Sequence, residues 1–151
     1  MRIAADAPRP VWDEFEFAVE CVDWEIRSYY DTVTGEVLVT GPFEDDPGER
    51  ERIDAEPARY LEIGQLDAPT ELEWMRAFTA TVGDAHLRHE LERDLAARKP
   101  FRRFKDGLLD APAERQRWFA FRDRQVKLWI EQWFDERELA VGAPPAWWTG
   151  N

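Results

Sequence analysis

The sequence predicts an α+β protein in which a small antiparallel sheet of about three strands packs against four to five helices, with a helical C-terminal half. Three observations predict this class. Short runs rich in β-branched and aromatic residues flank a turn at 31–35. Apolar residues recur at helical spacing beyond residue 68. The 151 residues are 44% hydrophobic, which is enough to form the core of a single domain spanning 1–151.

The first helix is predicted over 11–19. Val11, Phe15 and Val19 share one helical face, and the acids of the first turn complement the helix dipole. Phe17 falls off that face, so an alternating strand from 14 to 19 remains an alternative.

The strands are predicted at 24–30, 36–40 and 59–63. The first two form a hairpin, because residues 31–35 have turn chemistry and end in Gly35, which can adopt a positive φ. A third strand is expected beside them, since an isolated hairpin is only marginally stable in water.

Three segments are predicted to lack regular structure. Residues 44–56 are expected to form an acidic loop, because they are densely charged and contain Pro47-Gly48. Their acids do not follow the spacing of an EF-hand, so a solvated loop is favoured over a calcium loop. Residues 1–10 and 141–151 are expected to be extended tails, and both are rich in proline.

The C-terminal half is predicted to be helical. One helix has Pro69 in its first turn and ends at Gly83, and Asp84 is a candidate N-cap for the next helix. Pro100 interrupts before a short segment at 101–106, and the last helix runs from about 114 to 137. The expected core positions are Leu72, Met75, Phe78, Val82, Leu87, Leu91 and Leu95.

The last helix has one apolar sector on a helical wheel, with a cation in its middle. The sector comprises Trp118, Phe119, Val126, Trp129, Ile130 and Trp133. Arg122 falls within it, and an unpaired buried charge is very costly. The position therefore predicts a buried ion pair between Arg122 and an acid from the N-terminal half. Arg122 could otherwise snorkel to solvent.

A second apolar flank of the same helix is formed by Phe121 and Leu128. Two interpretations remain open. Trp147 and Trp148 of the C-terminal tail could cover it, or it could mediate a homo-oligomer.

Four stretches point to a family: residues 29–37 (YYDTVTGEV), 59–63 (RYLEI), 101–106 (FRRFKD) and Trp118. In these four stretches, and in their order along the chain, this sequence resembles the UPF0158 family of small bacterial proteins. Gly64 stands where family members usually place proline, which affects the local turn. The resemblance implies a shared fold, and it implies no catalytic residues, because the family has no established activity.

The net charge of −12 is unevenly distributed. Residues 1–85 carry 7 Lys/Arg and 21 Asp/Glu, whereas residues 86–127 carry 12 and 7. The densest cations are Arg98, Lys99, Arg102, Arg103 and Lys105, interleaved with Phe101 and Phe104. The simplest interpretation places both phenylalanines in the core and the cations in solvent or against the acidic half. The functional interpretation is a site for acidic or phosphate groups.

The leading functional hypothesis is a non-catalytic interaction module in which Arg102, Arg103 and Lys105 bind an acidic protein partner. RNA binding through the same segment is the alternative, disfavoured by the overall negative charge. A helix-turn-helix at 83–84 is also disfavoured, because its second helix carries acids that would repel DNA phosphates.

No catalytic residue, metal site or cofactor is predicted. Ser28 lies in no nucleophile elbow, and Cys21 lies among acids that dampen its nucleophilicity. His86, His89 and Glu90 do not match a zincin motif, so a surface contact between His86 and Glu90 is expected instead. A carboxylate-based enzyme is the third hypothesis, although no feature selects its residues.

The expected location is the cytoplasm. The N-terminus lacks the apolar core of a signal peptide, no apolar run is long enough to span a membrane, and a single cysteine allows no intrachain disulfide.

Overall fold

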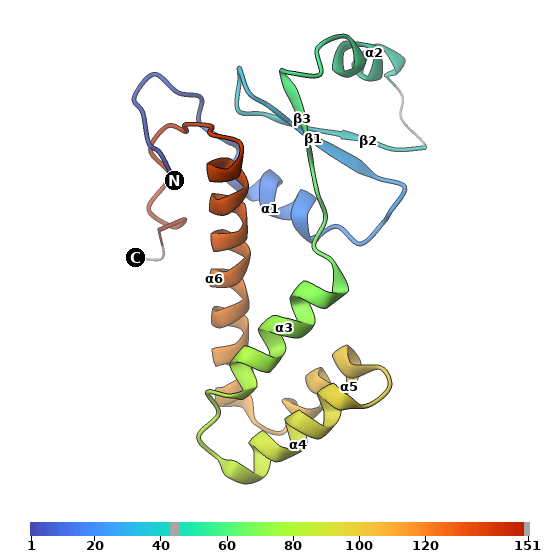
Figure 1. The fold of residues 1–151 in the computed structure, drawn as a ribbon, viewed down its shortest axis with the longest axis vertical. Coiled ribbons are helices and arrows are strands. Elements are labelled where there is room, and N and C mark those ends of the chain that lie inside the picture. The colour runs from blue at the N-terminus through green and yellow to red at the C-terminus, as the bar shows by residue number, and fades with distance from the viewer. Residues whose placement is uncertain (43–45, 150–151) are drawn as a thin grey trace. The chain divides into compact units, whose positions relative to one another are not determined.

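The structure, a computed structural model, describes residues 1–42 and 46–149, and its chain divides into two compact units (Figure 1). The first unit comprises Met1–Leu66 and Val126–Asn151, and the second comprises Asp67–Gln125. The described residues form six helices and one three-stranded antiparallel sheet, which confirms the α+β class. The helices are one more than the four to five predicted. The single-domain organisation stays a prediction.

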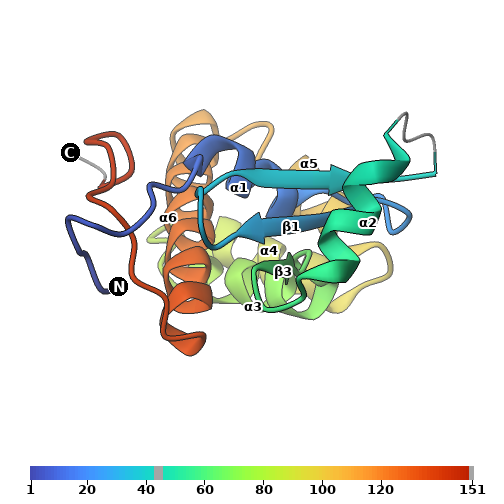
Figure 2. The same ribbon diagram turned by 90° about the horizontal axis from the view of Figure 1, so that it is seen from above.

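The sheet lies in the first unit and has the order β2-β1-β3 (Figure 2). Strand β1 (Arg27–Asp31) pairs antiparallel with β2 (Val37–Thr40) and with β3 (Tyr60–Ile63). The predicted hairpin and third strand are therefore confirmed. Gly35 closes the hairpin at φ 84° by donating its N–H to the Asp31 carbonyl at 2.8 Å, a left-handed position that suits glycine.

Helix α1 (Trp12–Glu20) packs against the sheet through an aromatic cluster. Phe15 is fully buried, with its ring centroid 5.8 Å from Tyr30 and 5.2 Å from Phe134. Phe17, which departed from the predicted helical face, is 70% exposed. The helix prediction is confirmed, and the alternative strand is wrong.

The prediction of a loop at 44–56 is wrong over most of its length. Pro47–Ala55 form helix α2, and Glu44 and Asp45 lie outside the described residues. The helix begins where Asp46 accepts a hydrogen bond from the Gly48 N–H at 3.0 Å and Pro47 occupies the first turn. Ile53 is its only buried residue, so the segment has almost no apolar periodicity to reveal it.

The second unit is helical and consists of α3 (Ala68–Thr79), α4 (Ala85–Ala96), α5 (Pro100–Gly107) and the N-terminal half of α6 (Pro112–Glu136). Asp84 caps α4 as predicted, accepting from the backbone N–H groups of the two residues that follow Ala85. The core comprises Met75, Phe78, Val82, Leu91, Leu95, Phe104, Leu108 and Trp118.

The wheel prediction for α6 is partly wrong. Trp118, Val126, Ile130 and Trp133 are buried as expected. Phe119 is 52% exposed beside the Arg115 guanidinium, and Phe134, which was not predicted, is fully buried. The reason is that α6 contributes its first half to one unit and its second half to the other, so one sector cannot describe the whole helix.

Within residues 1–10 and 141–149, which the structure describes, there is no helix or strand of the sheet, and the two segments pair with each other in the first unit. The Ala4 N–H donates to the Val141 carbonyl at 2.9 Å. Trp148 is buried, 4.2 Å from the Trp12 ring centroid, and its indole N–H donates to Glu131 at 3.1 Å. The tail thus packs as part of the core.

The flank formed by Phe121 and Leu128 is divided. Phe121 packs against Phe78 and Trp118 of the second unit, with centroids 5.7 Å and 6.0 Å away. Leu128 is 50% exposed, and Trp147 is 49% exposed. Self-association through this flank stays a prediction.

Candidate interaction surface on helix α5

Helix α5 is anchored in the second unit by its phenylalanines. Phe104 is fully buried, with its ring 5.0 Å from Trp118 and 6.3 Å from Phe78. Phe101 is partly buried against the same core. Their spacing of three places both rings on one face of the helix, so the intervening residues point elsewhere.

The cationic surface of α5, defined by Arg102, Arg103 and Lys105, is exposed. The Arg103 Nε donates to the Arg98 carbonyl at 2.9 Å, which holds its guanidinium over the start of the helix. The Arg102 Nε lies 4.0 Å from Asp106, a distance at which an exposed pair stabilises little. The Lys105 side chain has no hydrogen bond or ion pair within the described part of the chain. The three predicted binding residues are therefore all exposed on one short helix of eight residues.

Arg122 forms an ion pair with Glu71 of α3. Its Nε donates to Glu71 Oε1 at 3.1 Å, and its Nη2 contacts the same oxygen. The two side chains are 29% and 26% exposed, so the pair lies at the border of the core, more open than the predicted buried pair. Such a pair satisfies the cation that the wheel placed among apolar residues.

His86 and Glu90 form a surface contact on α4. The His86 Nε2 lies 3.0 Å from Glu90 Oε1, and the His86 side chain is 84% exposed. Among the residues that the structure describes, no group of three or more His, Cys, Asp or Glu side chains could hold a metal ion. Likewise, no helix within 1–42 and 46–149 has the length and apolar character to cross a membrane.

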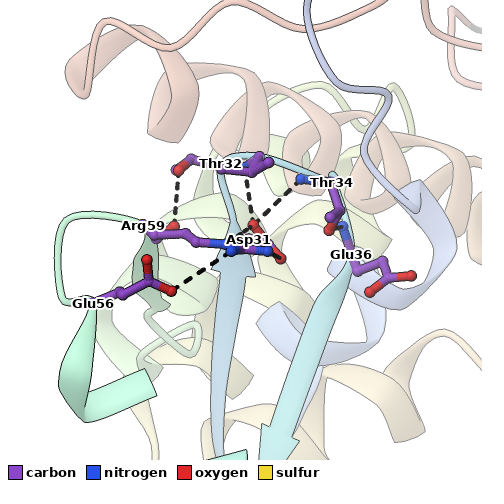
Figure 3. Close-up of polar contacts among 7 residues, drawn as sticks. Asp31, Thr32, Thr34, Glu36, Glu56 and Arg59 are labelled. Carbon is purple, nitrogen blue, oxygen red and sulfur yellow. Dashed lines mark hydrogen bonds and ion pairs between the residues drawn. The ribbon is translucent and has the colours of Figure 1, made fainter. Parts of the chain in front are cut away.

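A polar centre that sequence reasoning missed lies in the first unit (Figure 3). Asp31, at the end of β1, accepts from Arg59 Nε through Oδ1 and from Nη2 through Oδ2, each at 3.0 Å. Arg59 also lies 3.6 Å from Glu56, and its carbonyl accepts from the Thr32 hydroxyl at 2.9 Å. Asp31 and Arg59 belong to the two stretches at 29–37 and 59–63, which offered the only sequence signal for the contact.

The Asp31 carboxylate is held ionised. Burial alone would raise its pKa, but hydrogen bonds from the Arg59 guanidinium and from Val33 and Thr34 outweigh burial and lower the pKa to about 2. Burial, followed by the charge of Asp31, raises the pKa of Tyr30 above its ordinary value. Neither shift suits acid–base catalysis near neutral pH, since the carboxylate stays charged and the phenol stays protonated.

Together these features define an α+β protein with an ion pair that joins two strands and an exposed cationic helix. The chain belongs to UPF0158, an uncharacterised protein family, which matches residues 7–144. It is similar to the UPF0158 protein PA5073 of Pseudomonas aeruginosa, with 29% identity over 131 residues that cover 87% of this chain and 84% of the relative. No solved structure matches this chain.

Proposed function

We propose that this chain is a non-catalytic interaction protein that binds an acidic segment of a partner protein through the cationic surface of α5. The observation that carries the proposal is the division of roles within α5. Phe104 is buried, so the helix is fixed, while Arg102, Arg103 and Lys105 are exposed on it. Binding then costs little ordering of the backbone.

The chemistry of these side chains supports an acidic partner. Arginine guanidinium groups bind carboxylates through two parallel hydrogen bonds, and a lysine adds a further point charge. Residues 86–127 have an excess of cations in a chain whose net charge is −12. A local cationic surface of this kind selects the acidic segment by complementarity, while the remaining chain repels it. Action in the cytoplasm is part of the same proposal.

RNA binding is the less favoured alternative. Single-stranded RNA is held by stacking bases on exposed aromatic rings beside the cations. Phe104 is fully buried and Phe101 packs on the core, so neither ring offers a free face of that kind.

The proposal is tested by titrating a short fluorescein-labelled Glu-rich peptide, and separately a single-stranded RNA of matched charge, into the protein at several salt concentrations. We expect the peptide to bind wild type and to bind Arg102→Glu/Arg103→Glu at least about tenfold more weakly, through loss and reversal of two charges. Tighter binding of the RNA, with a steep salt dependence, would replace this proposal with the RNA alternative.

A charge-matched control lies in the same unit. Arg115 and Arg124 are exposed on α6, and Arg115→Glu/Arg124→Glu changes the net charge by the same amount. This control should bind the Glu-rich peptide within about twofold of wild type, since long-range charge effects are screened. Equal weakening in both double variants would mean that overall charge, and not the α5 surface, governs binding.

A further inference from the structure

Strand β2 presents an open hydrogen-bonding edge in the first unit. It is at the edge of the sheet, and its register pairs Tyr30 with Val37 and Ser28 with Val39. The Asp31 N–H donates to the Glu36 carbonyl, and bonded pairs alternate along an antiparallel ladder. The backbone N–H and C=O groups of Val37 and Val39 therefore point away from β1. Within the described residues, these outward backbone groups of Val37 and Val39 have no hydrogen-bond partner.

A groove of about 530 Å³ runs beside this edge. Its apolar lining includes Val37 and Val39 from β2 and Phe17 from α1. Val37 and Val39 are paired with the buried residues Tyr30 and Ser28, so their side chains point to the same face of the sheet. Helix α1 packs against this face. Phe17 is 70% exposed and Val39 is 46% exposed, so apolar surface lies open next to unpaired backbone groups.

The groove is acidic. Asp13 and Glu14 from α1 and Glu49 from α2 line it, and no lysine or arginine contributes to its lining among the described residues. An acidic occupant would be repelled, whereas lysine or arginine side chains would find three carboxylates.

We propose that β2 accepts an extended basic segment of a partner protein as an additional strand. The segment would hydrogen-bond the outward backbone groups of Val37 and Val39 and would turn lysine or arginine side chains toward α1, where their charged ends reach Asp13 and Glu14 and their aliphatic stems lie on Phe17. Alternation of basic and apolar residues is the pattern that fits, because alternate side chains of a strand point to the same face and the basic ones then all face α1. This site differs from the α5 surface in both location and sign of charge.

The test uses a synthetic peptide that alternates Val and Lys, followed by fluorescence anisotropy and by amide hydrogen exchange. Added strand pairing should protect the Val37 and Val39 amides, which are open in the free protein, and should leave those of Leu38 and Thr40 unchanged, since they already pair with β1. N-methylation of the peptide's backbone should abolish binding. Binding without protection of Val37 and Val39 would overturn the proposal.

Charge selectivity is tested with variants on the groove and away from it. The variant Asp13→Asn/Glu14→Gln should bind the Val/Lys peptide about fivefold more weakly than wild type. The control Glu51→Gln/Asp54→Asn changes exposed positions of α2 outside the groove lining and should bind the peptide as wild type does. A Val/Glu peptide that binds as well as the Val/Lys peptide would overturn the basic occupant. Self-association of the chain that the Val/Lys peptide displaces would instead assign the edge to a second copy.

Discussion

Asp31 and Arg59 form an ion pair that joins β1 and β3. Of the two strand pairs in the sheet, this is the one whose members are further apart in sequence. The carboxylate lies at the end of β1, and the guanidinium stands just before β3, with both of its bonded nitrogens 3.0 Å from Asp31 oxygens. The Asp31 side chain is 4% exposed and the Arg59 side chain is 31% exposed. The pair therefore combines a buried acceptor with a cation that still reaches solvent.

Replacing this carboxylate should destabilise the protein. We expect Asp31→Asn to lower the free energy of unfolding by about 2 kcal/mol, because a bidentate pair of opposite charges becomes a single hydrogen bond from the guanidinium to a neutral amide oxygen. Glu62→Gln is the matched control, because the Arg27–Glu62 pair also spans β1 and β3 but is exposed and 3.9 Å long. That control should change stability by less than about 0.5 kcal/mol. Urea denaturation that gives equal losses for both variants would contradict the assigned role.

The same carboxylate predicts a pH dependence of stability. Its folded-state pKa of about 2 lies below the ordinary value, so its stabilisation is complete above the unfolded-state pKa of about 4. This contribution is lost as the pH falls through the folded-state pKa. The difference in unfolding free energy between wild type and Asp31→Asn should therefore be constant from neutral pH to about pH 5 and shrink toward pH 2. A difference that grows on acidification would refute this.

Replacing Gly35 by alanine should destabilise the protein far more than replacing Gly64. The φ of Gly35 is +84°, and an added Cβ would lie 2.3 Å from the Arg9 carbonyl oxygen. Gly35→Ala should cost at least about 2 kcal/mol of unfolding free energy through backbone strain and this collision. Around Gly64 an added Cβ would meet no atom within 4 Å, so Gly64→Ala should change stability by less than about 1 kcal/mol. Chemical denaturation of both variants checks the prediction.

The Arg122–Glu71 pair predicts a smaller effect. Because both side chains are partly exposed, Arg122→Ala should lower the unfolding free energy by about 1 kcal/mol and the melting temperature by about 3 °C. Arg124→Ala, at an exposed position two residues along the same helix, should melt like wild type. If Arg122→Ala melts at the same temperature as wild type and Arg124→Ala, the Arg122–Glu71 pair contributes no stability.

Local signals predicted most of the elements. Asp84 and Gly35 act through hydrogen bonds within a few residues, so their roles follow from sequence alone. Helix α2 was missed because Ile53 is its only buried residue, which leaves charge to dominate the pattern. The exposure of Phe119 was missed because a wheel assigns one buried face to a helix that serves two compact units.

The functional surfaces were predicted unequally. The exposure of Arg102 and Arg103 follows from helical spacing around two core phenylalanines. The contact between Asp31 and Arg59 spans 28 residues and depends on which strands pair, which no local pattern encodes. The groove beside β2 likewise requires the sheet order, because the sequence alone does not say which strand is at the edge.

The most direct test of the central claim is affinity capture from a lysate of the source cells with three baits. These are wild type, Arg102→Glu/Arg103→Glu, and the charge-matched Arg115→Glu/Arg124→Glu, each verified as folded by circular dichroism. Bound protein is identified by mass spectrometry and bound nucleic acid by absorbance. The account predicts a protein with an acidic segment that wild type and the control retain and the α5 variant loses. Identical eluates from all three baits would contradict a binding role for α5.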